Sequence, residues 1–340
     1  AVTTFVVAVL WALYQPNYWA IFAGMVAGTM LPTILTWISA GWLPDRPRWV
    51  PDGRALLGFG AGVTGYKLSS FVSENADNVL IGRAWGGIEL GFYDRAYKLL
   101  LFPISRISSP LKQVMIPSLS RLIDEPYRYC SAFLRVQRLV LFVSLPGIAC
   151  AIALADVVVA VLLGSQWHAS ATIFQALGFA GLLRMLNSPS GWLFISQGRT
   201  RDYTLWGIVM AVLAVSAYLI GLPYGAFGVA VALSVAQYVM TPILWIWLCR
   251  KGPVRLRDVV ASAGPLILAA HLAVVGAFLA KPLLPTSPAL SLLTALVLSY
   301  ALTALIICTF PSGRATLRDG WELIAPFLTR KVKPASVAPR

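Results

Sequence analysis

The chain has 340 residues, of which 58% are hydrophobic and 12% are charged, and its formal net charge is +14. Soluble domains carry about 25% charged residues, so this composition excludes an ordinary soluble fold and indicates a membrane protein. In a soluble protein, so much positive charge would suggest nucleic acid as the partner. Here the basic residues flank apolar stretches, so we expect membrane lipids around the chain and no nucleic acid.

Basic residues recur at intervals along the chain. Of the 27 Lys and Arg residues, 19 lie in five segments, which are 42–54, 119–138, 198–203, 249–258 and 311–340. The long apolar stretches between them each bend once. Cytoplasmic loops of membrane proteins retain Lys and Arg. Each interval is therefore predicted to be a helical hairpin that leaves the cytoplasm and returns to it, and the C-terminus is predicted to be cytoplasmic.

Ten stretches have the composition of transmembrane helices, each of which needs about 20 mainly apolar residues. They are 1–14, 18–41, 55–82, 89–116, 132–163, 168–197, 203–221, 225–249, 257–280 and 288–310. We therefore expect an all-α polytopic membrane protein of about ten transmembrane helices. The first residues lie inside an apolar run without the charged start of a signal peptide, which indicates the C-terminal part of something longer.

Two of these stretches carry charged and amide residues at membrane depth. Those of 55–82 and 89–116 include Lys67, Glu74, Asp77, Asn78, Asp94, Arg95 and Arg106. A charge inside the bilayer is costly unless it is paired or faces water, so both helices should line a hydrated cavity. Ion pairs with a purely structural role stay an alternative, above all for Asp94 and Arg95.

The stretch 168–197 predicts a broken helix. Arg184 and Asn187 are followed by Pro189, which removes a backbone hydrogen bond, and by Gly191, which relaxes the chain. Broken helices at membrane depth occur where they face protein or a cavity, as in transporters. We expect Arg184 and Asn187 to face the same cavity as the charges above.

Cysteine and histidine do not indicate metal or cofactor chemistry. The four cysteines are far apart in the sequence, and neither His168 nor His271 belongs to a cluster with ligand spacing. We therefore expect no metal site, no cofactor and no disulfide framework. His271, alone on an apolar helix, is expected to lie outside the cavity and to be functionally silent.

The strings DNVLIGR at 77–83 and LGFYDRA at 90–96, followed by Pro103, resemble a signature of bacterial oligosaccharide flippases. The string IPSLSRL at 116–122 is also similar. These are the Wzx-like branches of the multidrug/oligosaccharidyl-lipid/polysaccharide exporter superfamily. The resemblance covers about residues 17–250 and is specific in its middle third.

The resemblance implies a division of the chain, because family members have two six-helix lobes joined by a cytoplasmic linker. Residues 1–41 look like the last two helices of the first lobe, and 42–54 look like the linker. Residues 55–250 would be the complete second lobe, 251–310 an additional helix pair, and 311–340 a basic cytoplasmic tail. About four N-terminal helices of the family's pattern are then missing, whereas alternating access needs both lobes.

The resemblance also implies an activity, which is not enzymatic. A polyprenyl-pyrophosphate-linked oligosaccharide would be flipped across the bacterial inner membrane for lipopolysaccharide, exopolysaccharide or capsule biosynthesis. Arginine and lysine suit a pyrophosphate. The candidate substrate-binding cations are Lys67, Arg95, Arg106 and Arg184. The candidate polar or ion-coupling residues are Glu74, Asp77, Asn78, Asp94 and Asn187, of which the acids could instead pair with the cations.

Three other functions stay open. A cation-coupled multidrug antiporter of the same fold should have an aromatic, acidic cavity with few cations, whereas basic groups outnumber acidic ones here. A membrane glycan polymerase should have a long outer loop with catalytic groups, which we do not find. A non-transporting scaffold would agree with the missing helices. Glycan polymerase machinery remains a candidate partner.

Overall fold

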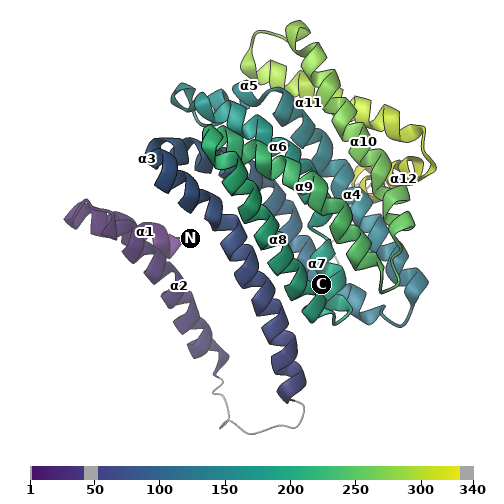
Figure 1. Ribbon diagram of the computed structural model, residues 1–340, viewed down its shortest axis with the longest axis horizontal. Helices are drawn as coiled ribbons and strands as arrows, with labels where there is room; N and C mark the ends of the chain where they lie inside the picture. The colour runs from purple at the N-terminus through teal and green to yellow at the C-terminus, as the bar shows by residue number, and fades with distance from the viewer. Residues whose placement is uncertain (1, 42–52, 330–340) are drawn as a thin grey trace, which may run out of the picture. The chain divides into compact units, whose positions relative to one another are not determined.

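The computed structural model describes residues 2–41 and 53–329. These residues form α-helices and short 3-10 helices, with no strand among them. The chain divides into two compact units, residues 1–54 and residues 55–340 (Figure 1). Most of the predicted linker 42–54 and the end of the predicted tail, 330–340, lie outside the described residues.

The first unit is a helical hairpin of α1 (Val2–Tyr14) and α2 (Trp19–Ala40). The two helices pack closely through a glycine, because a Cβ added at Gly24 would lie 2.6 Å from the carbonyl oxygen of Thr4. Small residues at helix contacts are typical of membrane proteins. The bounds agree with the predicted stretches 1–14 and 18–41 over the residues described.

The second unit opens with α3 (Gly53–Arg121), which consists of two arms that meet at Gly86. Gly86 has φ 83° and ψ −179°, a conformation that side chains disfavour. The hydroxyl of Tyr93 donates to Asp77 Oδ2 at 2.8 Å, although the two residues would be about 24 Å apart in a straight helix. The chain therefore folds back at Gly86, as the predicted pair 55–82 and 89–116 requires.

Further helices follow in the order of the predicted spans. They are α4 (Pro126–Ala153), α5 (Ala155–Leu162), α6 (Ala169–Asn187), α7 (Ser190–Ser196), α8 (Thr200–Gly221), α9 (Gly225–Cys249), α10 (Leu256–Ala280), α11 (Pro288–Cys308) and α12 (Pro311–Thr329). Three short 3-10 helices stand between them, η1 (Ser165–Trp167), η2 (Leu222–Tyr224) and η3 (Lys281–Leu283).

Two of the predicted spans are interrupted. The break predicted in 168–197 is confirmed, because α6 ends at Asn187 and α7 begins after Pro189. The prediction of one long helix over 132–163 is wrong, since the helix begins at Pro126 and leaves helical geometry at Leu154. The sequence at Leu154 carries neither proline nor glycine, so composition gave no signal of this break.

The helices that follow α3 form a bundle around α4. This helix packs against α6, α10 and α11, and 13 of its 28 residues are buried. Phe133, Leu141 and Leu145 lie in the shared core. The core holds the bundle as one body, so the side chains of α6 that face away from α4 have fixed positions.

Basic segments gather at one end of this bundle. Tyr129, near the start of α4, is hydrogen-bonded to Ser196 at the end of α7 with 2.6 Å between the hydroxyl oxygens. Arg199, just before α8, donates to the carbonyl of Lys251, just after α9, at 2.6 Å. The starts and ends of these helices therefore meet, which agrees with the predicted hairpins.

The bends of the hairpins lie at the opposite end. The indole of Trp85, beside the turn of α3, donates to the carbonyl of Leu222 at 2.7 Å. Lys281, just after α10, pairs with Asp156 on α5 at 2.8 Å. Both contacts join segments that are predicted to leave the membrane on the side away from the basic segments.

The predicted basic tail begins with a helix that sequence reasoning missed. Asp319 on α12 accepts hydrogen bonds or ion pairs from Arg135 and Arg138 on α4, each at 3.1 Å, and Glu322 pairs with Arg135 at 2.9 Å. The segment 311–340 has six basic residues, and its only two acids are Asp319 and Glu322, so its net charge gave no sign of a helix that pairs with α4. This helix therefore docks on the bundle instead of extending from it.

Six helical stretches of the described residues are long and apolar enough to cross a bilayer, with α8 and α9 forming one of them. The stretch α3 is not among them, because its arms carry charges. The predicted all-α polytopic membrane protein is confirmed. The assignment of residues to lobes stays a prediction.

Candidate functional site

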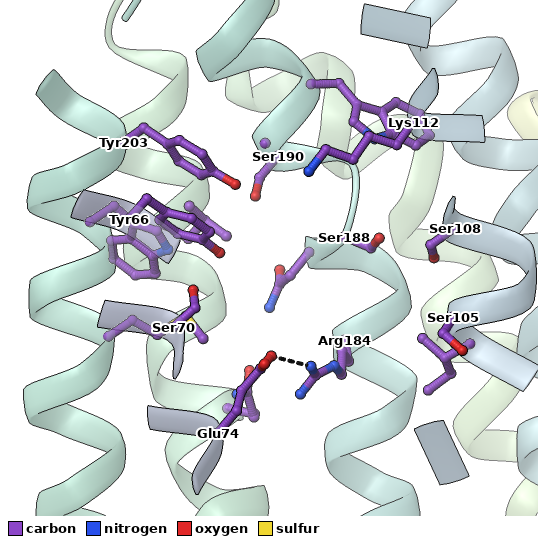
Figure 2. Close-up of a pocket in the computed structure, with 18 of the residues that line it drawn as sticks. Tyr66, Ser70, Glu74, Ser105, Ser108, Lys112, Arg184, Ser188, Ser190 and Tyr203 are labelled. Atoms are coloured by element: carbon purple, nitrogen blue, oxygen red, sulfur yellow. Dashed lines mark hydrogen bonds and ion pairs between the residues drawn. The ribbon is translucent and has the colours of Figure 1, made fainter. Parts of the chain in front are cut away.

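A cavity of about 440 Å³ lies in the second unit between both arms of α3 and the helices α6, α7, α8 and α9 (Figure 2). Eight of its 21 lining residues carry hydroxyl groups, and apolar side chains such as Ile104, Trp206 and Met240 line much of the rest. The hydroxyl groups belong to Tyr66, Ser70, Ser105, Ser108, Ser109, Ser188, Ser190 and Tyr203. The hydroxyl of Ser108 is buried and has no hydrogen-bond partner among the described residues. The cavity is therefore suited to a ligand rich in oxygen atoms.

Helical periodicity explains why α3 contributes these residues. Tyr66, Ser70 and Glu74 follow one another at a spacing of four on the first arm, which places them on one face of the helix. On the second arm, Ser105, Ser108 and residues 109 and 112 repeat the same three- and four-residue spacing. Both arms thus turn a polar stripe toward the cavity.

Arg184 occupies the cavity wall on α6, and two groups of α3 hold its guanidinium. Nη2 donates to Glu74 Oε1 at 2.7 Å (Figure 2). Nη1 donates to the hydroxyl of Tyr97 at 3.0 Å. Glu74 is on the first arm of α3 and Tyr97 is on the second, so one guanidinium contacts both arms. The phenol of Tyr97 is buried, while the carboxylate of Glu74 is partly open to the cavity.

Asn187 fixes the end of α6 where the helix breaks. Its Nδ2 donates to Thr241 Oγ1 at 2.8 Å, and its Oδ1 accepts from the indole of Trp245 at 3.1 Å. Both partners are on α9. The amide is thus engaged at both of its polar atoms, and it links α6 to α9 immediately before the break at Pro189.

Gly191 lets α7 approach α8 at the cavity wall. A Cβ at this position would lie 2.8 Å from the hydroxyl oxygen of Tyr203. The ring of Tyr203 stacks on that of Tyr66, with 3.6 Å between centroids and 13° between planes. The flexible sequence around Gly191 therefore serves close packing as well as the helix break.

Lys112 is a cavity cation that sequence reasoning did not select. It lines the cavity on the second arm of α3, and its ammonium group points toward Ser190 in Figure 2. No carboxylate pairs with it among the residues that the structure describes. Its spacing of seven residues from Ser105 was the signal available in the sequence.

The structure does not bring the four predicted cations together, because only Arg184 lines this cavity. The guanidinium of Arg95 lies over the ring of Trp167, 5.4 Å from its centroid, and that of Arg106 lies over Phe102 at 5.1 Å. Lys67 is exposed. Successive side chains on a helix point about 100° apart. Lys67 and Arg106 therefore point away from the cavity that their neighbours Tyr66 and Ser105 line.

Three of the predicted polar residues also lie outside the cavity lining. Asp77 is fully buried, and it accepts from the hydroxyl of Tyr93 and from the backbone N–H of Asn78, both at 2.8 Å. Asp94 pairs with Lys98 at 2.8 Å, one turn along the same helix. Local partners therefore satisfy both acids.

His271 and the cysteines do not contribute to the site. The ring of His271 contacts the hydroxyl of Tyr238 and the carbonyl of Ile267, away from the cavity lining. Among the residues described, no group of three His, Cys, Asp or Glu side chains could hold a metal ion.

Comparison with known proteins identifies the family. Residues 1–172 match the model of a family described as polysaccharide biosynthesis protein. The chain belongs to this family. The resemblance drawn from the strings at 77–83 and 90–96 is thereby confirmed.

Curated relatives from several bacteria are similar to parts of the chain. The teichuronic acid biosynthesis protein TuaB of Bacillus subtilis is 27% identical over 48% of this chain and 36% of its own length. The lipopolysaccharide biosynthesis protein WzxC of Escherichia coli is 23% identical over 54% and 38%. The succinoglycan biosynthesis transport protein ExoT of Rhizobium meliloti is 22% identical over 81% and 56%. The chain thus spans about a third to just over half of the length of these relatives.

A solved structure shares the fold. The lipid II flippase MurJ in an inward closed conformation superposes with a TM-score of 0.63 at 12% identity, covering 96% of this chain and 67% of MurJ. At this identity the similarity shows the fold alone. It agrees with a multi-pass membrane protein built of packed helices.

Proposed function

We propose that this chain provides the second lobe of a flippase that moves a polyprenyl-pyrophosphate-linked oligosaccharide across the bacterial inner membrane. The observation that carries the proposal is the hydroxyl-lined cavity that holds Arg184 and Lys112 inside a bundle of membrane helices. Membership of a polysaccharide biosynthesis family supports it. The protein moves its substrate without breaking a covalent bond, so the proposal includes no catalytic residue.

The cavity suits both parts of such a substrate. Arg184 and Lys112 outnumber Glu74 in the lining, so the site favours an anion. A guanidinium binds phosphate oxygens in pairs, and an ammonium acts as a point charge. The serine and tyrosine hydroxyls can exchange hydrogen bonds with a sugar. A volume of about 440 Å³ is within the usual range of ligand pockets, roughly 300–1,000 Å³, which fits the pyrophosphate and the sugar next to it.

The remaining predicted residues take supporting roles in this proposal. Lys67, Arg95 and Arg106 contact the substrate outside the cavity, along the exposed surface of α3. Asp77 joins the two arms of α3 through Tyr93 and accepts from the backbone N–H of Asn78, Asp94 pairs with Lys98 within the second arm, and Asn187 holds the end of α6. We infer smaller effects on transport from these positions than from Arg184 and Lys112, because the six remaining predicted residues on α3 lie outside the cavity lining and the amide of Asn187 is already bonded to α9.

The orientation of the chain belongs to the same proposal. The end of the bundle that carries Arg128, Arg201 and Arg255 faces the cytoplasm, since cytoplasmic loops retain basic residues. Residues 1–41 are then the last two helices of the first lobe, and 251–310 are an additional pair. Cysteine labelling from each side of the membrane tests this, with position 201 expected to react from the cytoplasm and position 224 from outside.

A drug antiporter and a glycan polymerase are less well supported. An antiporter for cationic drugs needs an acidic cavity, whereas the one acid here is paired with Arg184. A polymerase would be a partner that uses the flipped glycan. Export of a cationic dye by cells that express the protein, with no glycan display, would favour the antiporter.

The test of the proposal is surface glycan display in cells that lack their own flippase and express the full-length protein. Arg184→Ala and Lys112→Ala should each lower display about ten- to a hundredfold, because a charge-assisted hydrogen bond contributes about 1.5–3 kcal/mol. Arg184→Lys should restore part of it, since the charge remains but the paired geometry does not.

Lys281→Ala is the matched control, because it removes an equally charged side chain at the far end of the bundle. It should leave display unchanged. Wild-type display by both cavity variants, at equal protein levels, would reject the proposed role of the cations.

A further inference from the structure

We propose that Glu74 and the pyrophosphate compete for the guanidinium of Arg184, so that Glu74 is the internal ligand that the substrate replaces. This inference rests on the proposed function. It gives Glu74 a positioning role, in which the carboxylate acts through Arg184 and through the helix that carries it.

The geometry around Arg184 separates a fixed contact from an exchangeable one. Tyr97 holds Nη1 at 3.0 Å from a buried position on the second arm of α3. Glu74 holds Nη2 at 2.7 Å with a side chain that is 44% exposed and lines the cavity. A ligand in the cavity can therefore reach the same nitrogen from the side on which Glu74 lies, while Tyr97 keeps the guanidinium in place.

The energetics also favour exchange. Ion pairs with this degree of exposure contribute little net stability, because water solvates the separated charges well. A pyrophosphate carries more charge than a carboxylate and offers more oxygen acceptors to the arginine fork. The ion pair of Arg138 and Asp319 is different, since both side chains are less than 20% exposed and neither lines the cavity. Of these two ion pairs, the pair of Arg184 and Glu74 in the cavity is the one that can separate and form again at low cost.

Exchange would couple binding to helix movement. Glu74 is on the first arm of α3, and Arg184 is on α6 one turn before the break at Ser188 and Pro189. The ion pair thus ties these two elements together beside a joint. Binding of pyrophosphate releases the first arm of α3 from α6, while Tyr97 keeps the second arm in contact with Arg184, and return of Glu74 to Arg184 expels the pyrophosphate. A variant without the Glu74 charge should therefore bind more tightly and transport more slowly.

The experiment measures affinity and transport on the same variants of the full-length protein. Isothermal titration calorimetry in detergent uses farnesyl pyrophosphate, a short polyprenyl pyrophosphate, as the probe. Glu74→Gln should lower Kd about two- to fivefold and reduce glycan display. Arg184→Gln should lose binding. Asp156→Asn is the matched control. The carboxylate of Asp156 is also about half exposed and also forms a short ion pair, with Lys281 at 2.8 Å, but this pair lies outside the cavity lining. Its Kd and its display should equal those of the wild type.

The outcomes separate this inference from the proposed function. Suppose that the wild type binds the probe and Arg184→Gln does not. A Kd for Glu74→Gln that is equal to or higher than the wild-type Kd would then show that Glu74 does not compete with pyrophosphate for Arg184. If Glu74→Gln does not accumulate, Glu74→Asp replaces it and should give a Kd between those expected for wild type and Glu74→Gln. A wild-type or higher Kd for Glu74→Asp overturns the competition as well. Absence of binding by the wild type would instead contradict the proposed function.

Discussion

At the scale of single residues, the helix face on which a cation lies decides whether its charge can contact a ligand in the cavity. Lys67, Arg106 and Lys112 are all positively charged and lie on the two arms of α3, yet of these three only Lys112 lines the cavity. Its position on the stripe with Ser105 and Ser108 decides this. Residue type and hydropathy do not reveal helical phase relative to a cavity, so the cation set needed the structure, whereas Arg184 followed from its place beside a predicted break.

Close packing at Gly191 gives a prediction at this scale. Gly191→Ala should lower the stability of the protein by about 1–3 kcal/mol, because the new methyl group would lie 2.8 Å from the hydroxyl oxygen of Tyr203. The double variant Gly191→Ala with Tyr203→Phe should recover part of the loss, since the other ring atoms are at least 3.4 Å away. Thermal unfolding in detergent measures both. An unchanged midpoint for Gly191→Ala would contradict the packing described here.

At the scale of elements, most helix bounds were predictable because apolar length and basic flanks both mark a span. The ends of α8, α9 and α11 lie within a few residues of the predicted stretches. Two features were not predictable in this way. The break at Leu154 has no proline or glycine, and α12 carries two acidic residues beside two arginines in a segment that looked like a basic tail. Both depend on contacts with distant helices.

The ion pair between Arg138 on α4 and Asp319 on α12 should stabilise the packing of α12 on the bundle. Arg138→Ala should lower stability by about 1–3 kcal/mol, because it leaves Asp319 with fewer partners in a poorly solvated contact. Arg128→Ala is the control, since its ion pair with Glu125 is well exposed and such pairs contribute less than about 1 kcal/mol. Equal thermal midpoints for the two variants would contradict a stabilising role of the Arg138–Asp319 pair.

At the scale of the whole molecule, fold and family agree although the sequence identities are low. The chain superposes on a lipid II flippase at 12% identity, because hydropathy and hairpin order fix the helix arrangement more strongly than individual side chains do. The family followed from short strings around the turn of α3, where Asp77 and Tyr93 hold the two arms together. The order of apolar spans and basic segments was enough to propose a division into lobes. The residues that contact the substrate could not be predicted in this way, because they depend on which side chains line the cavity.

The most direct test of the central claim is translocation by the purified full-length protein in proteoliposomes. The substrate is a fluorescent polyprenyl-pyrophosphate glycan, and the signal is the fraction that becomes accessible on the opposite side. We expect transport by the wild type and by Lys281→Ala, and at least a tenfold lower rate for Arg184→Ala combined with Lys112→Ala. An equal rate for the wild type and the double variant would contradict the claim that these two cations carry the pyrophosphate.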